Sequence, residues 1–477
     1  MAIDGKGSIT DNDIFIFPKN QSLTADDLRG FIHYQINTLC ENYKENISMY
    51  KGHYPILDKK PKPLNKPDNR IVINFAKYIV DVFNGYLFGI PPQITYDGDD
   101  KVNEDLQNFN NTNSITDKLN EVAKQTSIYG RSYLFCYYDE HGQMKSAISS
   151  PQNSFIVYDN TIAQTPLYFI RYIVDDSNHL TISVYDGTQQ TTYNDSYQII
   201  SQTDHMIGSV PAIEFIENEE RQGVFESVKT IMNGINNAVS QKANDVEAIA
   251  DAYLYLSGGS IKKDDLQSMA DNRVIINPEA DSKAEFLTRP NGDGTQENLL
   301  DRLEKRLFTI AMVANLDNID SGASSTASGY SIELRMQSMR GLASNKERKF
   351  TNALREFYKL WFDARDTVDF TLENKVKKIK QFLSGTAKDD PINHLQFKFS
   401  RNLPRNIADE ANTAKTLEGI VSKETQLGVL SNVPDPKAEI QKIEEEANQK
   451  INNAIKNNPA DYDFTTPSKI SGEEDGK

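Results

Sequence analysis

The chain has 477 residues and a formal net charge of −16, with 52 Lys and Arg against 68 Asp and Glu. The length predicts two to four domains. The acidic balance argues against tight, non-specific binding of nucleic acid, which normally needs a basic patch. The apolar share of 38% is low and favours an elongated protein that is stabilised by neighbours in an oligomer.

The two cysteines, Cys40 and Cys136, lie far apart without CxxC spacing, so we expect a reducing compartment. The first residues lack the basic and apolar blocks of a signal peptide. No apolar run reaches the roughly 18 residues that cross a bilayer. We therefore expect a protein that is soluble and intracellular where it is made, with no membrane partner.

Residues 1–23 are rich in Gly, Asp and Asn and are expected to form an N-terminal arm. A helix is predicted from Thr24, because Asp27 stands three residues later as a capping-box partner and apolar residues follow at helical spacing. A second helix is predicted from Asn74 to about Leu87.

A third helix is predicted from Ser114 to about Tyr129, again with an acidic residue, Asp117, at the capping-box position. β-like runs separated by Asp, Asn and Gly turns follow at residues 132–138, 168–174, 180–185 and 197–201. Residues 24–222 therefore predict an α+β domain. The acidic group at residues 97–100 favours a turn over a cation site.

A single helix without proline is predicted for residues 223–257. Such a helix of about 34 residues is roughly 50 Å long and needs a partner along most of its length. Its apolar seam also contains one charged residue, and the seam consists of Phe225, Val228, Met232, Ile235, Val239, Lys242, Val246, Ile249 and Tyr253.

A small β hairpin is predicted within residues 258–294, from two strand candidates at 273–277 and 283–289 joined by a turn. A second helix follows at 295–314, so the two helices can lie antiparallel with the hairpin projecting at one end. Residues 315–329 form a long loop of small, polar residues. This composition favours a flexible linker, although loops of this size between long helices are often functional.

A third long helix is predicted from about residue 330 to 362, within a segment that extends to 380. Its many basic residues favour a solvated face, with a contact to phosphates or an acidic neighbour as the sharper alternative. Helices at about 407–421 and 434–455 follow a β-like run at 395–400, within residues 381–456. Residues 457–477 are expected to be disordered.

The motifs of common enzyme and metal sites are missing from the sequence. It has no GxxxxGK[ST], HExxH, zinc spacing, EF-hand or GxSxG pattern, and its six histidines are scattered. We therefore expect no catalytic residue, no metal and no cofactor, and a protein that is not an enzyme.

Four stretches of the chain resemble the portal (connector) proteins of tailed bacteriophages, in the branch common among siphophages of Gram-positive hosts. They lie at residues 50–57 with 69–81, at 85–91, at the Ser328-Gly329 step, and at 399–406 with 421–425 and 435–439. In order and spacing these stretches span nearly the whole chain. Tyr330 departs from the family pattern, in which a small residue usually follows the glycine.

The resemblance implies a mainly helical α+β portal architecture that assembles as a ring, twelve-fold in the virion, at one capsid vertex. Residues 24–222 would form the wing, 223–257 and 295–314 the stem helices, 258–294 the clip and 381–456 the crown, inside the head. Double-stranded DNA would pass non-specifically through the ring during packaging and ejection. Implied partners are terminase, a head-completion (adaptor) protein, and the major capsid and scaffolding proteins. The protein would lie in the virion, and in the host cytoplasm during assembly.

The resemblance also assigns roles to three sets of residues. The seam residues of 223–257 would pack on neighbouring stem helices, where Lys242 is expected either to form a charged ring or to extend between subunits. Loop 315–329 would face DNA as the tunnel loop, through Asn318, Asp320, Ser321, Gly322, Ser324, Ser325, Thr326 and Ser328. The clip would dock partners through Lys262, Lys263, Asp264, Asp265, Arg273, Glu279, Asp281 and Lys283.

Two alternatives from other classes remain. A DNA-processing enzyme of the packaging apparatus, such as a nuclease, would need clustered carboxylates for metal, which the sequence does not locate. A coiled-coil scaffold would explain the seven-residue spacing between Phe225 and Tyr253, but not the β-rich region or the hairpin.

Overall fold

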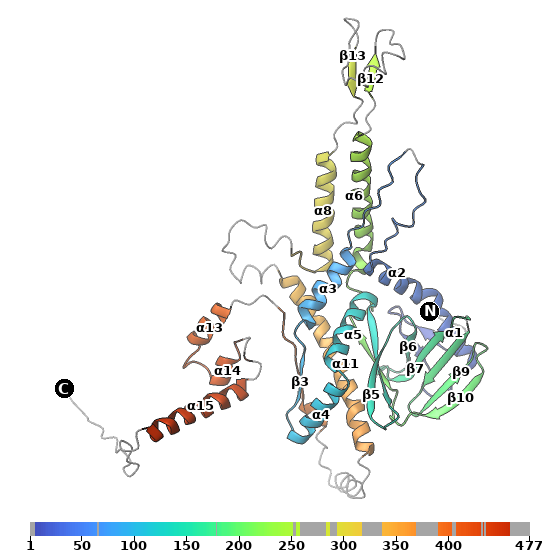
Figure 1. The fold of residues 1–477 in the computed structure, drawn as a ribbon. Coiled ribbons are helices and arrows are strands. Elements are labelled where there is room, and N and C mark those ends of the chain that lie inside the picture. The colour runs from blue at the N-terminus through green and yellow to red at the C-terminus, as the bar shows by residue number, and fades with distance from the viewer. Residues whose placement is uncertain are drawn as a thin grey trace, which may run out of the picture. The chain divides into compact units, whose positions relative to one another are not determined.

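The computed structural model describes residues 5–63, 66–177, 179–250, 254–257, 283–286, 293–316, 336–368, 390–402, 407–430, 433 and 436–457. The chain divides into two compact units. The first contains residues 1–326 and 332–402, and the second contains 327–331 and 403–477. Helices and predominantly antiparallel sheets occur together in the first unit, so the predicted α+β class is confirmed (Figure 1).

The larger sheet has seven strands in the order β1-β2-β6-β7-β8-β9-β10, and only its β2–β6 pair is parallel. Its strands are β1 Ser8–Ile9, β2 Phe15–Phe17, β6 Ser154–Asp159, β7 Pro166–Val174, β8 Leu180–Tyr185, β9 Gln189–Tyr193 and β10 Ile199–Asp204. The expected N-terminal arm thus contributes two strands to the sheet. Alternation along β2 buries Phe15 and Phe17, and the Phe15 ring lies 4.4 Å from that of Phe155.

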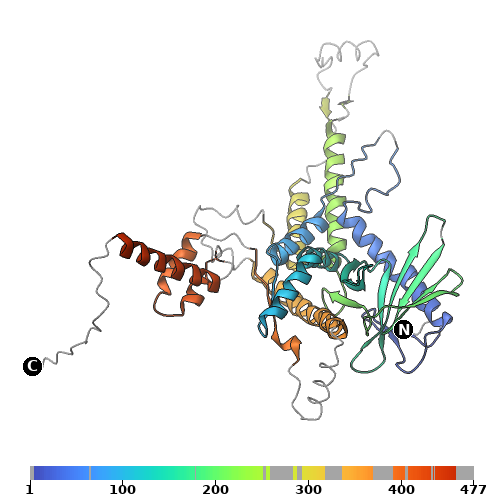
Figure 2. The same cartoon turned by 60° about the horizontal axis from the view of Figure 1, so that its bottom comes forward.

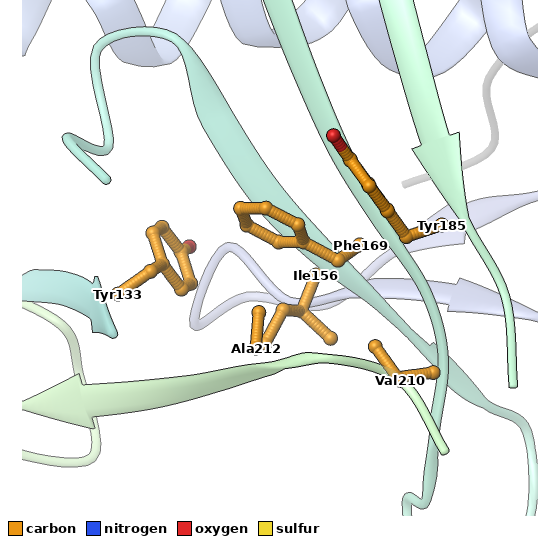
Figure 3. Packing of buried hydrophobic residues seen from close by; sticks show 6 residues of the cluster. All are labelled: Tyr133, Ile156, Phe169, Tyr185, Val210 and Ala212. Atoms are coloured by element: carbon orange, nitrogen blue, oxygen red, sulfur yellow. The ribbon is translucent and has the colours of Figure 1, made fainter. Parts of the chain in front are cut away.

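A smaller sheet has the order β11-β4-β5 and consists of β4 Arg131–Tyr138, β5 Met144–Ser149 and β11 Ala212–Ile216. One hydrophobic core joins the two sheets. Its buried members are Tyr133, Ile156, Phe169, Tyr185, Val210 and Ala212. Figure 3 shows Phe169 and Ile156 of the larger sheet beside Ala212 of the smaller one. The predicted β runs from 132 to 201 are confirmed as strands.

The first helical stretch comprises α1 Ala25–Tyr34, a π-helical turn η1 Gln35–Leu39 and α2 Cys40–Tyr50. The predicted capping box of Thr24 and Asp27 is present. The side-chain amide of Gln35, in the π-helical turn, donates to the Pro151 carbonyl at 2.6 Å, and the thiol of Cys40, at the start of α2, donates to the Gln152 carbonyl at 3.1 Å. These bonds hold the helix against the turn before β6.

Three further helices follow, α3 Phe75–Phe88, α4 Asp100–Thr112 and α5 Ile115–Tyr129, and α5 packs on the smaller sheet. The predicted second helix is confirmed as α3, and the Asn74 side chain caps it by accepting a hydrogen bond from the amide of Lys77. The predicted capping box at Ser114 is wrong, because Ser114 has a φ of 49° in the left-handed region and makes no capping bond. The acidic group at 97–100 begins α4, where Asp99 accepts hydrogen bonds from the amides of Lys101 and Val102.

The central rod is shorter than predicted. After a 3₁₀ turn, η2 Glu226–Val228, helix α6 covers Lys229–Ala250, which is about 33 Å. Residues 254–257, predicted as helix, form β12 Leu254–Ser257 and pair antiparallel with β13 Lys283–Phe286. Their cross-strand hydrogen bonds replace the helical ones. Of the two strand candidates, 273–277 lies outside the described residues, and α8 Asp293–Ala311 matches the second predicted helix.

The long helix α11 Gln337–Val368 packs on β11 and leads, beyond the undescribed residues, to η3 Pro391–His394 and β14 Leu395–Lys398. β14 pairs antiparallel with β3 Gln93–Tyr96, both within the first unit. The second unit contains α13 Ile407–Thr416, α14 Lys423–Leu427 and α15 Pro436–Asn457, of which the sequence predicted the first and third.

Candidate assembly surface

The candidate site is the antiparallel pair of α6 and α8 with the chain segment beside it. Figures 1 and 2 both show α6 (green) between α8 (yellow) and the blue segment that precedes α3. Lys242 forms an ion pair with Glu297, and Gln296 donates to Asp245 at 3.5 Å, so the start of α8 lies beside the second half of α6. The expectation of an antiparallel pair is confirmed.

The opposite face of α6 carries a row of short polar side chains that hold residues 69–73. The amide of Asn69 donates to the Asn244 side-chain oxygen at 2.6 Å, that of Ile71 to the Ser240 hydroxyl at 2.9 Å, and that of Ile73 to the Asn236 side-chain oxygen at 2.9 Å. These three hydrogen bonds join alternate residues of one segment to every fourth residue of a helix. Two residues of extended chain span about 6.7 Å and four of helix about 6 Å, so the spacings match.

The first turns of α6 are anchored in the body of the first unit. Phe225, Val228, Met232 and Ile235 are buried within the single chain. The Tyr54 hydroxyl, itself buried, donates to the Met232 sulfur at 3.8 Å and accepts from the amide of Ala76 at 3.0 Å. These contacts root α6 against the start of α3.

The predicted seam residues therefore divide into two groups. Phe225, Val228, Met232 and Ile235 pack inside their own chain, which corrects the expectation that they face a neighbouring subunit: their surface is already covered. Val239 is half-buried and Val246 is 62% exposed, so for these two a subunit contact stays a prediction. The side chain of Ile249, and Tyr253 as a whole, lie outside the described residues.

The Lys242 ammonium group pairs with Glu297 of the same chain, so its charge is balanced without a contact to a second subunit. The charged residue in the seam thus marks where α8 lies against α6. All eight tunnel-loop residues lie outside the described residues. Of the clip residues only Lys283 is described, at the start of β13 opposite Ser257.

Two stretches of the chain that carried the family resemblance meet at Gly89, although they are far apart in sequence. Asn402 donates its amide to the Tyr86 carbonyl at 2.9 Å, and a Cβ on Gly89 would overlap with the Asn402 side chain. The Phe399 ring packs edge-on against Phe88 at 5.8 Å. The glycine is needed where the returning chain crosses the end of α3.

A buried ion pair joins α11 to the smaller sheet. The Lys346 ammonium donates to the Glu217 carboxylate at 2.6 Å, to the Ser127 hydroxyl at 2.8 Å and to the Ala123 carbonyl at 2.8 Å. Both charged side chains are 1% exposed. Burial lowers the pKa of Lys346, and Glu217 acts in the opposite direction. The interpretation of the basic helix as a solvated face is wrong at this residue.

A second buried group lies at Glu214 on β11. Arg221 donates to this carboxylate at 2.8 and 3.1 Å, the Tyr158 hydroxyl donates at 2.9 Å, and Arg131 lies at 3.5 Å. Burial alone raises the pKa of Glu214, but the two guanidinium groups outweigh it and lower the pKa to about 2. The carboxylate is therefore charged at neutral pH, and its hydrogen bonds hold β11 to Arg221 and Tyr158.

The polar row on α6 was missed by the sequence reasoning, which followed only apolar residues. Its signal was available: Asn236, Ser240 and Asn244 recur every four residues beside the apolar seam. Within the described ranges no group of three or more His, Cys, Asp and Glu side chains could hold a metal ion. Among the same residues, no helix is long and apolar enough to span a membrane.

Comparison with known proteins gives consistent matches along the chain. The portal protein of Bacillus phage SPP1 is 24% identical over 452 residues, covering 88% of this chain and 84% of its own length. The portal protein of Clostridium phage phiCD119 is 23% identical over 411 residues, covering 80% and 85%.

A solved chain from the virion of a native gene transfer agent particle has a TM-score of 0.39 and 10% identity, covering 81% of this chain and 92% of that one; at this TM-score the likeness carries no argument. The family model described as "Phage portal protein, SPP1 Gp6-like" matches residues 30–453. The chain therefore belongs to the phage portal protein family of the SPP1 Gp6-like type.

Proposed function

We propose that this chain is the subunit of a portal ring at one vertex of a phage capsid, through which double-stranded DNA is packaged and ejected. The observation that carries the proposal is the family match over residues 30–453, together with two curated relatives named as portal proteins. The ring has twelve subunits in the virion, and it contacts the major capsid and scaffolding proteins. The comparisons give no support to the nuclease alternative.

The parts of the fold suit this role. Residues 24–222 form the wing, α6 and α8 the stem, and residues 381–456 the crown inside the head. Residues 258–294 form the clip, which docks terminase during packaging and a head-completion protein afterwards. The stem helices are rooted at Tyr54 and Met232 and braced by the polar row on α6, so they form a rod that tolerates load.

The acidic net charge of −16 also suits a channel, because repulsion between the wall and the phosphates prevents DNA from binding during translocation. Residues 315–329, made mostly of small polar side chains, are the DNA-facing tunnel loop. In this role the protein requires no catalytic residue, metal or cofactor.

Electron microscopy of the purified chain tests the ring directly. We expect rings with a central hole, and native mass spectrometry then counts the subunits. A chain that stays monomeric at all concentrations and salt conditions would overturn the proposal. Cleavage of plasmid DNA by the purified chain with magnesium would instead favour the nuclease.

The DNA-facing role of the loop is tested by deleting residues 321–327. We expect rings to form normally while packaging of DNA into capsids falls. Loss of the rings would mean that the loop serves assembly. A matched control is the exchange of the same residues for a different Gly/Ser sequence of equal length, which should package DNA.

A further inference from the structure

The helix pair α6–α8 has two sides that nothing in the described chain covers along its outer half. On α6, Lys242 and Asp245 face α8, whereas Ser240 and Asn244 face residues 69–73. With 3.6 residues per turn these two faces are about 180° apart, and Val246 lies about a quarter turn from both. Val239 and Ala243 lie on the same side as Val246.

Helix α8 divides in the same way. Gln296, Leu307 and Ala311 mark its face toward α6 and the body of the unit, since Gln296 bonds to α6 and the other two are buried. Helical spacing places Asp301 on one flank of that face and Arg306 on the other. Leu299 and Ile310, which are 50% and 48% exposed, share the flank of Arg306.

The direction of the two helices decides which flanks share a side. Both helices are right-handed and they run antiparallel. Viewed from one end of the pair, successive residues therefore turn clockwise around one helix and anticlockwise around the other. The flank of α6 that carries Val246 thus lies on the same side of the pair as the flank of α8 that carries Asp301. Contacts at the base of the pair agree with this geometry. Met232 of α6 bonds to Tyr54, which lies beside the start of α3, and Phe308 of α8 packs at 5.9 Å against Phe75 of α3, so both helices meet α3 on the same side of the pair.

The pair therefore has an acidic side and a basic side. We define the acidic side as Val239, Ala243, Val246, Glu297 and Asp301, and the basic side as Leu299, Arg302, Arg306 and Ile310. Asp301, Arg302 and Arg306 are exposed, and none of them has an ion-pair partner within the part of the chain that the structure describes. Glu297 is already paired with Lys242, so the unpaired charge of the acidic side is Asp301, and that of the basic side is Arg302 and Arg306. Each side thus combines aliphatic groups with unpaired charge of one sign.

We propose that the acidic side of one copy packs on the basic side of a second copy of this chain. The charges are complementary, and the aliphatic side chains of both sides would leave water together. Two different surfaces of the same chain form a heterologous contact, which closes into a ring when the rotation between copies permits. The inference rests on the proposed portal ring and specifies which surfaces build it.

The geometry of a ring brings the charged groups within reach. In copies related by rotation about an axis along the helices, residues of equal number lie at equal height. Asp301 then differs in height from Arg302 of the neighbouring copy by about 1.5 Å, and from Arg306 by about 7.5 Å. Both differences in height lie within the combined reach of an arginine and an aspartate side chain.

Charge exchange tests the pairing. The variants Asp301→Arg and Arg306→Asp should each raise the protein concentration for half-assembly at least tenfold in analytical ultracentrifugation. The double variant, in which both charges are exchanged, should return to within about threefold of the original protein. An equimolar mixture of the two single variants should also assemble, because each supplies the charge that the other needs. Lys305→Glu is the matched control, since Lys305 points away from α6, and it should assemble normally.

The outcomes separate the two proposals. An original protein that never assembles would overturn the portal ring, and the inference with it. An original protein that forms rings, with single variants that assemble equally well, would leave the ring intact and overturn the pairing of the two sides. Circular dichroism first checks that each variant is folded. If the folded single variants, the double variant and the mixture all fail to assemble, the pairing is overturned too.

Discussion

Replacing Lys346 with Met should destabilise the first unit strongly, because it leaves the Glu217 carboxylate buried without a counter-ion. The lost interactions are the bonds at 2.6 Å to Glu217, 2.8 Å to Ser127 and 2.8 Å to the Ala123 carbonyl. Both charged side chains are almost fully removed from water. Breaking one partner of such a pair typically costs about 3–5 kcal/mol.

A neighbouring ion pair on the same helix supplies the control. Lys349 pairs with Glu219, but these two side chains are 31% and 60% exposed, and an exposed pair contributes about 0–1 kcal/mol. Lys349→Met should therefore change stability little. The double variant Lys346→Met with Glu217→Gln should recover part of the loss, because no buried charge remains.

Chemical denaturation followed by circular dichroism measures these differences, with all variants at one low protein concentration so that assembly contributes equally. The denaturation midpoint should fall in the order original, Lys349→Met, double variant, Lys346→Met. Equal midpoints for Lys346→Met and Lys349→Met would refute the reasoning that burial, and not ion pairing alone, makes Glu217 dependent on its partner.

Three further predictions concern the buried carboxylate of Glu214, the polar row on α6 and the glycine at position 130. Acid should weaken the protein at Glu214, because its pKa of about 2 lies below the roughly 4.3 of an unfolded chain: the contribution is complete above that value, and up to about 3 kcal/mol is lost as pH falls toward 2. The stability difference between the original and Glu214→Gln, measured by denaturation, should accordingly shrink from pH 5 to pH 3. Ser240→Ala should cost about 1–2 kcal/mol by removing the partner of a backbone amide, and hydrogen exchange at residues 69–73 should accelerate. Gly130→Ala should cost about 2 kcal/mol or more in thermal unfolding, because Gly130 has a φ of 83° and a Cβ would overlap with the Arg221 carbonyl.

Each of these has an outcome that contradicts it. A constant difference between the original and Glu214→Gln across the pH range would mean that Glu214 has the same pKa in the folded and the unfolded protein. Exchange at residues 69–73 that is unchanged in Ser240→Ala would mean that the polar row does not hold the segment. Gly142 also has a positive φ but open space around it, so Gly142→Ala should be milder than Gly130→Ala.

Much of the local structure followed from the sequence. The Thr24–Asp27 capping box, the helix after Asn74 and the strands from 132 to 201 depend on short-range hydrogen bonds and on the spacing of apolar residues. The same spacing located the second helix of the pair, α8. The family resemblance was also readable, because its motifs occur in order along the chain.

Local signals failed where a distant segment competes for the same residues. Residues 254–257 continue the helical pattern of α6, yet their backbone groups bond to β13, which lies nearly thirty residues further on. Ser114 has the sequence of a cap, but the chain must reverse there after α4, so its backbone cannot adopt the capping conformation. In both cases tertiary contacts outweighed a propensity of about 1 kcal/mol.

The sequence by itself determined that a long helix crosses the centre of the chain and that a shorter one returns beside it. Only the tertiary structure decided which side chains of that pair are free to meet another copy. Met232 and Val246 stand on the same apolar seam, but the body of the unit covers the first and leaves the second exposed. The reason is physical: helical periodicity defines faces, whereas burial depends on which distant segments pack against them.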